Sequence, residues 1–169
     1  HASSHPPRRM PLRPRSAAAL AAALVAAPLA LAPARGGAQA PTDRLLVVDT
    51  RLNRVVTVSA IDGSIVNASF ITDANSAATY DFQTPRAAIR VADQIWVSDQ
   101  SPSVNAIYRF DLAGNYLGRV GGNVAGGGLS NVRGLRYIDG VVYAVNAGTA
   151  NGAPGAAIVR IATDGTILG

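Results

Sequence analysis

Short apolar runs separated by turn residues fill the chain from residue 44 onward. The first three runs are Arg44–Asp49, Arg54–Ser59 and Ser64–Thr72, and an Asp62-Gly63 turn lies between the second and the third. Runs of this length, rich in β-branched residues and bounded by turn formers, predict β-strands, and an Asp-Gly pair predicts a tight hairpin. The connections are too short for crossover helices, so the three strands are predicted to be antiparallel.

The same pattern recurs twice in the rest of the chain. The second predicted set of strands is Arg86–Val91, Ile95–Ser98, Ala106–Phe110 and Tyr116–Val120. The third set is Val132–Ile138, Val141–Val145 and Ala156–Ile161, with a further strand beginning at Thr166–Leu168. No segment after residue 40 combines a 3.6-residue apolar period with helix caps, so the sequence predicts an all-β fold.

A repeat of about 50 residues underlies these sets of strands. Gly63, Gly114 and Gly165 are spaced 51 residues apart, and Pro85–Asp99 aligns without gaps on Val132–Asn146, 47 residues later. Four short meandering strands per repeat are typical of one propeller blade. The predicted fold is therefore a partial β-propeller of about three four-stranded antiparallel blades.

The number of repeats leads to an expectation about length. A propeller holds roughly four to eight blades, so a closed ring of such repeats needs about 190 to 390 residues. Residues 41–169 fall short of that range. We therefore expect the sequence to be a fragment, truncated at its C-terminus, of a longer propeller protein, with open sheet edges that favour aggregation.

The first 40 residues resemble an export signal. Met10 is the single methionine and the expected initiator, which leaves residues 1–9 as upstream or added sequence. Two arginines follow it, then the Ala/Leu run Ser16–Leu31 and an Ala38-Gln39-Ala40 motif. This order predicts a signal peptide over residues 10–40, cleaved after Ala40, and a secreted or periplasmic location. The alternative is a retained membrane anchor over Ser16–Ala34, which Pro28 and Pro33 disfavour.

Composition narrows the possible functions. From Pro41 onward the chain has ten Arg and ten Asp, so this part carries no formal net charge. It therefore lacks the excess of positive charge that favours binding to nucleic acid. We expect no membrane span once the signal is removed. The chain has no Cys, and its two histidines, His1 and His5, precede the leader. No thiol or imidazole is left for catalysis, so no catalytic residue is predicted and a non-enzymatic role is favoured.

Three polar residues end the second strand of successive repeats: Asp49, Asp99 and Asn146. Their oxygens could converge on a central Ca²⁺, which prefers six to eight oxygen ligands. The simpler interpretation, which we favour, is that each side chain caps the following turn by bonding local main-chain N–H groups. No other cofactor is indicated, and the metal, if there is one, is not identified.

Two further repeated pairs are candidate binding residues. Arg109 and Arg160 occupy equivalent positions, with Thr57 as their counterpart in the first repeat, and could bind an anion. The favoured interpretation is that both face solvent and pair with a nearby Asp. Trp96 and Tyr143 are also equivalent, and are expected to pack between blades rather than to stack on a ligand.

The second repeat resembles NHL-type repeats and their six-bladed relatives. The matching parts are Pro85-Arg86-Ala87, Ile95-Trp96-Val97-Ser98-Asp99, Arg109-Phe110, and Asp111-Leu112-Ala113-Gly114 followed by Leu117-Gly118. In the third repeat, Val132 replaces the proline and Ala162 replaces the aspartate of the turn.

That resemblance covers residues 44–169 and implies the fold without choosing a function. Similar proteins include protein-binding and RNA-binding scaffolds, lyases and calcium-dependent lactonases. The expected function is an exported scaffold that binds an unknown protein or small molecule. The alternatives are a calcium-dependent lactonase-like or lyase-like enzyme and an anchored structural protein of the cell surface.

Overall fold

The computed structural model describes residues 44–73 and 80–169. The chain divides into two units, His1–Gly37 and Ala38–Gly169, and every described residue belongs to the second unit. The predicted signal peptide and its cleavage site after Ala40 lie outside the described residues. Within residues 44–73 and 80–169, no helix is both long and apolar enough to cross a membrane.

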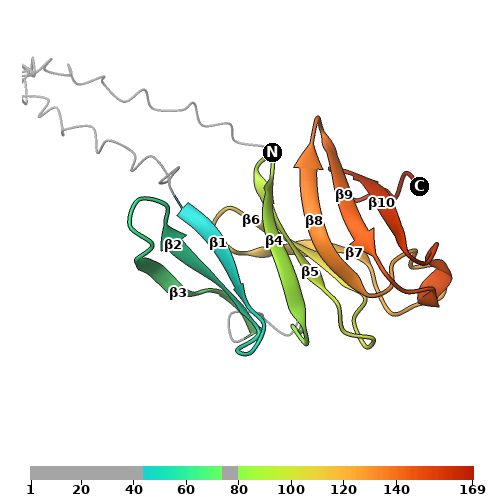
Figure 1. The fold of residues 1–169 in the computed structure, drawn as a ribbon, viewed down its shortest axis with the longest axis horizontal. Coiled ribbons are helices and arrows are strands. Elements are labelled where there is room, and N and C mark those ends of the chain that lie inside the picture. The colour runs from blue at the N-terminus through green and yellow to red at the C-terminus, as the bar shows by residue number, and fades with distance from the viewer. Residues whose placement is uncertain (1–43, 74–79) are drawn as a thin grey trace, which may run out of the picture. The chain divides into compact units, whose positions relative to one another are not determined.

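Three antiparallel sheets make up the described part of the chain (Figure 1). Sheet A holds three strands in the order β1-β2-β3, with β1 at Arg44–Asp49, β2 at Arg54–Ser59 and β3 at Ile65–Thr72. Sheet B is β4-β5-β6-β7, with bounds Pro85–Val91, Gln94–Asp99, Ala106–Asp111 and Tyr116–Gly121. Sheet C is β8-β9-β10, with bounds Val132–Ile138, Val141–Asn146 and Ala157–Ala162.

The predicted strands are confirmed to within a residue or two at their ends. Every strand pairs with its neighbour in the sequence, as the short connections required. The predicted four strands are present in sheet B, whereas sheets A and C have three each. The fourth strand expected at Thr166–Leu168 is reduced to a bridge between Ile161 and Ile167, with hydrogen bonds that join Arg160 to Leu168 and Gly169. One short 3₁₀ helix, η2 (Ala150–Gly152), occupies the loop after β9.

The three glycines spaced 51 residues apart lie in similar turns, although the turn of sheet A is one residue longer than those of sheets B and C. Gly63, Gly114 and Gly165 have φ values of 72°, 91° and 101°, a region that a residue with a Cβ adopts at a steric cost. The N–H group of each glycine donates to the carbonyl of the residue at the end of the preceding strand: Ser59, Asp111 and Ala162. The 51-residue spacing therefore reflects a repeated structural turn.

Two hydrophobic cores join the sheets. The first lies between sheets A and B and includes Val55, Ile71, Val97 and Phe110. Five rings gather in and beside it, with neighbouring centroids 5.0–6.2 Å apart: Tyr80, Phe82, Tyr108, Phe110 and Tyr116. Edge-to-face and tilted contacts at these distances stabilise the pairs by about 0.5–1.5 kcal/mol each beyond their buried area.

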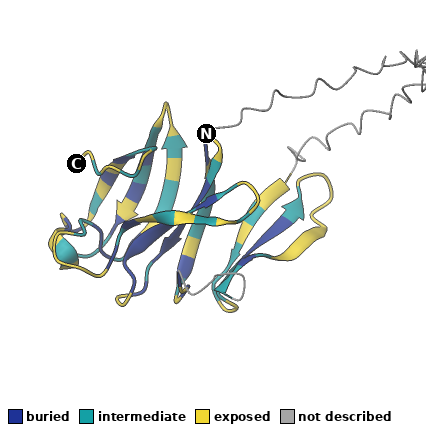
Figure 2. Cartoon of the chain, turned by 180° about the vertical axis from the view of Figure 1, so that it is seen from behind, coloured by how far each residue is buried: buried dark blue, intermediate teal, exposed yellow. Residues whose placement is uncertain are grey.

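The second core lies between sheets B and C. Trp96 and Ile107 of sheet B meet Val142 and Ile161 of sheet C, and none of the four exposes any surface. Trp96 thus packs between sheets, as predicted. Both faces of sheet B are covered, whereas most of β3 and one face of sheet C are exposed (Figure 2).

Candidate functional site

Loops of sheets B and C meet at one edge of the two sheets. Because the strands are antiparallel, β4 begins where β5 ends, and β8 begins where β9 ends. The edge strands β4 and β8 of the two sheets are in contact, so the two edges are continuous. The residues that precede β4 and β8, and the loops that follow β5 and β9, therefore lie at one edge. This is the region in which the structure forms its polar hollows.

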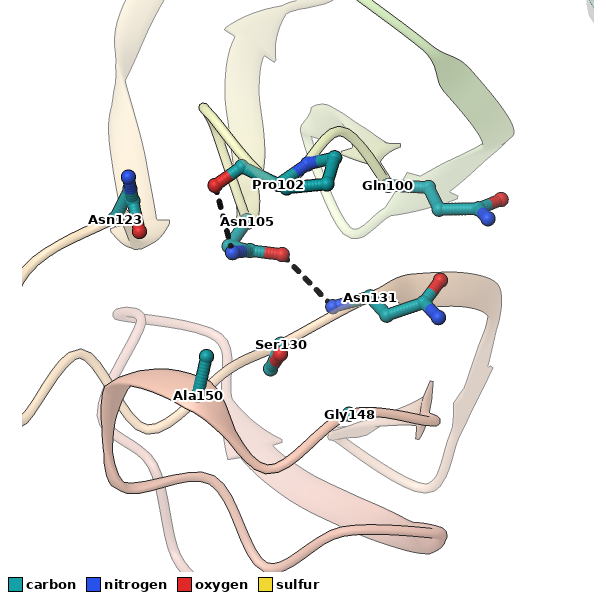
Figure 3. Close-up of a pocket in the computed structure, with 8 residues that line it drawn as sticks. All are labelled: Gln100, Pro102, Asn105, Asn123, Ser130, Asn131, Gly148 and Ala150. Atoms are coloured by element: carbon teal, nitrogen blue, oxygen red, sulfur yellow. Dashed lines mark hydrogen bonds between the residues drawn. The ribbon is translucent and has the colours of Figure 1, made fainter.

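A polar pocket of about 320 Å³ lies between these loops (Figure 3). Its lining is rich in amide and hydroxyl groups and consists of Gln100, Pro102, Asn105, Asn123, Ser130, Asn131, Gly148 and Ala150. Asn105 occupies the middle: its Oδ1 accepts a hydrogen bond from the N–H of Asn131 at 2.8 Å, and its Nδ2 donates to the carbonyl of Pro102 at 3.2 Å. The Asn105 side chain thus ties the sheet B loop to the sheet C loop.

Two asparagines in this pocket adopt the left-handed backbone conformation. Asn105 has φ 47° and Asn131 has φ 55°. Asparagine tolerates this region better than most residues with a Cβ. Gly148 meets a different constraint, because a Cβ there would overlap the hydroxyl of Ser130. A larger residue at this point of the pocket wall would therefore force Ser130 to shift.

A second hollow of about 350 Å³ adjoins the first through Gln100. Its lining is Arg86, Gln100 and Arg133. Arg86 is the second residue of β4 and Arg133 is the second residue of β8, so the two guanidinium groups come from equivalent places in consecutive sheets. Nε of Arg86 donates to Oε1 of Gln100, and Nε of Arg133 lies 3.5 Å from Oδ1 of Asn131. Among the described lining residues of these two hollows, two are cationic and none is acidic.

A third hollow of about 510 Å³ begins at Arg133 and runs over the ends of β9 and β10. It is mostly apolar and includes Val145, Ala157 and Ile158.

Asp99 and Asn146 fix the loops around this edge. Asp99 is fully buried, and its carboxylate accepts hydrogen bonds from the N–H groups of Gln83, Thr84 and Ser101 at 2.8–3.1 Å. Asn146 is 2% exposed; its Oδ1 accepts from the N–H of Ser130 at 2.6 Å, and its Nδ2 donates to the carbonyls of Gly148 and Gly155 at 2.8 and 2.7 Å. Each side chain holds the segment before its sheet against the loop after its second strand.

Asp49, the third member of that predicted set, bonds only nearby groups. Its carboxylate accepts from the N–H of Leu52 and from Nε of Arg54, both at 3.1 Å. Partial burial acts to raise the pKa of Asp49, but these two partners outweigh it and hold the pKa below its ordinary value. Asp49, Asp99 and Asn146 share no hydrogen-bond partner. In the part of the chain that the structure describes, no three histidine, cysteine or acidic side chains gather as a metal site would require.

The expectation for Arg109 holds only in part: its charge helps, after hydrogen bonds from Thr166, to lower the pKa of Asp164, but the side chain is not fully exposed. It is half-buried, its Cζ lies 5.9 Å from the ring centroid of Trp96, and its Nη1 donates to the main-chain carbonyl of Asp164 at 2.6 Å. The turn of sheet C lies against this side chain, since a Cβ at Gly165 would be 3.3 Å from Nη1 of Arg109. Arg160 is exposed on β10 and lies opposite the half-buried Tyr143 on β9, as Arg109 lies opposite Trp96.

The amide-rich pocket and the Arg86–Arg133 pair were missed by reasoning from the sequence alone. One signal for them was present: the gapless alignment of Pro85–Asp99 on Val132–Asn146 places Arg86 on Arg133 as an identity. Gln100, Asn105 and Asn131 lie in loops, where no strand pattern marks them.

No family model matches the chain, and no curated protein matches its sequence significantly.

Proposed function

We propose that this chain is an exported binding module of β-propeller architecture, and that the loop edge of sheets B and C binds a small anionic ligand. The ligand class is a polar carboxylate or phosphate compound, such as an acidic sugar. In this proposal sheets A, B and C are three consecutive blades, and the leader at residues 10–40 directs the protein out of the cytoplasm.

The arrangement of the sheets supports the propeller. Each sheet is a meander of neighbouring strands, consecutive sheets share a hydrophobic core, and the edge strands β4 and β8 are in contact. Stacked meanders that each cover the next are how propeller blades bury their apolar faces.

The pair Arg86 and Arg133 carries the ligand assignment. Two guanidinium groups line one hollow that no described acidic side chain shares, so they lack a protein counter-charge there. Guanidinium groups bind carboxylate and phosphate through paired, charge-assisted hydrogen bonds. The neighbouring amides of Gln100, Asn105 and Asn131 supply donors and acceptors for hydroxyl or carbonyl groups. The volumes of the two hollows, about 320 and 350 Å³, lie at the small end of the range for small-molecule sites.

Titration calorimetry with citrate, inorganic phosphate and glucuronate, at one fixed ionic strength, tests this assignment. We expect at least one probe to bind, and Arg86→Gln or Arg133→Gln to weaken that binding roughly 10-fold to 100-fold, the loss expected for a hydrogen bond to a charged group. Arg90→Gln is the matched control, since Arg90 is an exposed arginine on the same strand as Arg86 and lies outside both hollows. No heat with any probe, or equal affinity in all three variants, would contradict the proposal.

A further inference from the structure

The chain makes the same kind of contact between sheets twice. In each case the turn after the third strand of a repeat packs on the sheet before it. A Cβ added to Gly114 would lie 3.0 Å from the carbonyl of Phe70 in sheet A, and one added to Gly165 would lie 3.1 Å from Val120 in sheet B. At Gly63, the equivalent position in sheet A, a Cβ would meet nothing within 4 Å. The turn of sheet A thus has a similar glycine with positive φ but no neighbour there.

Apolar strand residues show the same difference: two that are covered in sheet B have exposed counterparts in sheet A. In sheet B, Ile95 and Val97 are 4% and 0% exposed because they pack on sheet A. Their counterparts in sheet A, Leu45 and Val47, are 55% and 44% exposed, although Val56, which pairs with Val47, is 7% exposed on the same face. We call it the leading face of sheet A; it comprises Leu45, Val47 and the exposed turn Ile61-Asp62-Gly63.

The opposite surface of sheet C lacks a neighbour in the same way. In sheet B, Ser98 and Ile107 are fully buried under sheet C, and Arg109 reaches the turn of sheet C. We call the corresponding surface of sheet C its trailing face; it comprises Tyr143, Val145, Ile158 and Arg160. Val145 and Ile158 are 41% and 56% exposed.

We propose that the trailing face of sheet C binds the leading face of sheet A of a second copy of this chain. The contact between sheets B and C indicates the occupant. Sheet C covers the trailing face of sheet B with its own leading face and its Asp164-Gly165 turn. Among the described residues, sheet A has the one leading face of this kind that is uncovered. In this contact Arg160 of one copy donates to the carbonyl of Asp62 in the other, as Arg109 does to Asp164.

Two copies can satisfy both of their faces at once. The six described sheets of two copies lie within the range of roughly four to eight blades in a closed propeller, so a head-to-tail dimer has enough sheets for a ring. This inference extends the propeller arrangement proposed above but does not depend on the anionic ligand, whose hollows lie at the loop edge. A variant that no longer dimerises can therefore still be tested for ligand binding, and a variant that no longer binds the ligand can still be tested for dimerisation.

Sedimentation of the full chain at several concentrations tests the contact. We expect a dimer that Ile158→Asp converts to a monomer. Val124→Asp is the matched control, because Val124 is 54% exposed in the connector between β7 and β8 and belongs to neither face. A monomer at every concentration up to about 100 μM, weaker than specific association requires, would overturn the proposal.

A mixing experiment separates the head-to-tail contact from a symmetric one and from misfolding. Leu45→Asp damages only the leading face, and Ile158→Asp damages only the trailing face. Each variant alone is expected to be a monomer, and the mixture is expected to form dimers through the one intact pair of faces. If two trailing faces bound each other instead, the Leu45→Asp variant would dimerise by itself, and the proposal would be wrong. Circular dichroism of each monomer checks that it is folded.

Discussion

Arg109 donates a hydrogen bond of 2.6 Å to the main-chain carbonyl of Asp164, which lies 55 residues further along the chain. The same guanidinium lies over the ring of Trp96. Arg109 therefore joins three places: its own strand β6, the neighbouring strand β5 and the turn of sheet C. A side chain that the sequence suggested as a solvent-facing or anion-binding residue is a connection between two sheets.

Replacing Arg109 is expected to weaken the contact between sheets B and C. Arg109→Ala removes a charge-assisted hydrogen bond and a cation–π contact, so we expect the free energy of unfolding to fall by about 1–3 kcal/mol. Urea denaturation at a fixed protein concentration measures this. Arg51→Ala, at an exposed turn position of sheet A, is the control and is expected to stay within about 0.5 kcal/mol of the parent protein. Equal effects would mean that the Arg109 contact stabilises nothing.

Asp99 is expected to be among the most sensitive positions of the fold. Asp99→Ala leaves the N–H groups of Gln83, Thr84 and Ser101 without their acceptor in a buried place, at a cost of about 3 kcal/mol or more. Asp99→Asn keeps one acceptor oxygen and is expected to cost less than Asp99→Ala. Thermal unfolding of the two variants gives the order, and an alanine variant as stable as the parent would contradict the clamping role.

Ala92 offers a stabilising substitution. It is exposed in the hairpin turn between β4 and β5 with φ 53°, where a Cβ is strained. Ala92→Gly removes the strain without losing a buried contact, and we expect a gain of about 0.5–1 kcal/mol in the free energy of unfolding. Ala113→Gly, an exposed turn position with negative φ, is expected to be neutral or slightly destabilising. A loss of stability in Ala92→Gly would show that the turn is not strained.

Alkaline pH is expected to destabilise the core between sheets A and B. Burial raises the pKa of both Tyr80 and Tyr108 to about 12, from about 10 in an unfolded chain. Between these two pKa values the folded chain binds more protons than the unfolded chain. The contribution of the two tyrosines to the free energy of unfolding is therefore fully present below about pH 10 and is lost as the pH rises toward 12. The chain has no Lys and no Cys, so tyrosines are the side chains that titrate in this window.

Denaturation at intervals between about pH 9 and about pH 12 measures this loss. The double variant Tyr80→Phe, Tyr108→Phe is expected to flatten the slope with pH. It is also expected to be less stable at neutral pH, because the hydrogen bonds of the two hydroxyls to the carbonyls of Thr72 and Asp81 disappear. An unchanged slope would assign the alkaline transition to other groups.

The strands could be read from the sequence because each follows a local rule. Runs such as Arg54–Ser59 carry β-branched residues between turn formers, and the repeated glycines mark turns that need positive φ. The environment of Arg109 could not be read in this way, because it depends on a turn 55 residues away. The pocket around Asn105 was missed for the same reason: its residues come from loops of two repeats, and only the stacking of the sheets brings them together.

The order of strands also bears on how the chain reaches this state. Each strand hydrogen-bonds the strand next to it in the sequence, so every sheet is assembled from short, local loop closures. Short closures of this kind carry a small loop-entropy cost. A hairpin forms in about 1–10 μs, whereas synthesis adds about 5–20 residues per second. Sheet B can therefore form its meander before the residues of sheet C have been made, and the hydrophobic core between sheets grows in the order in which the repeats emerge.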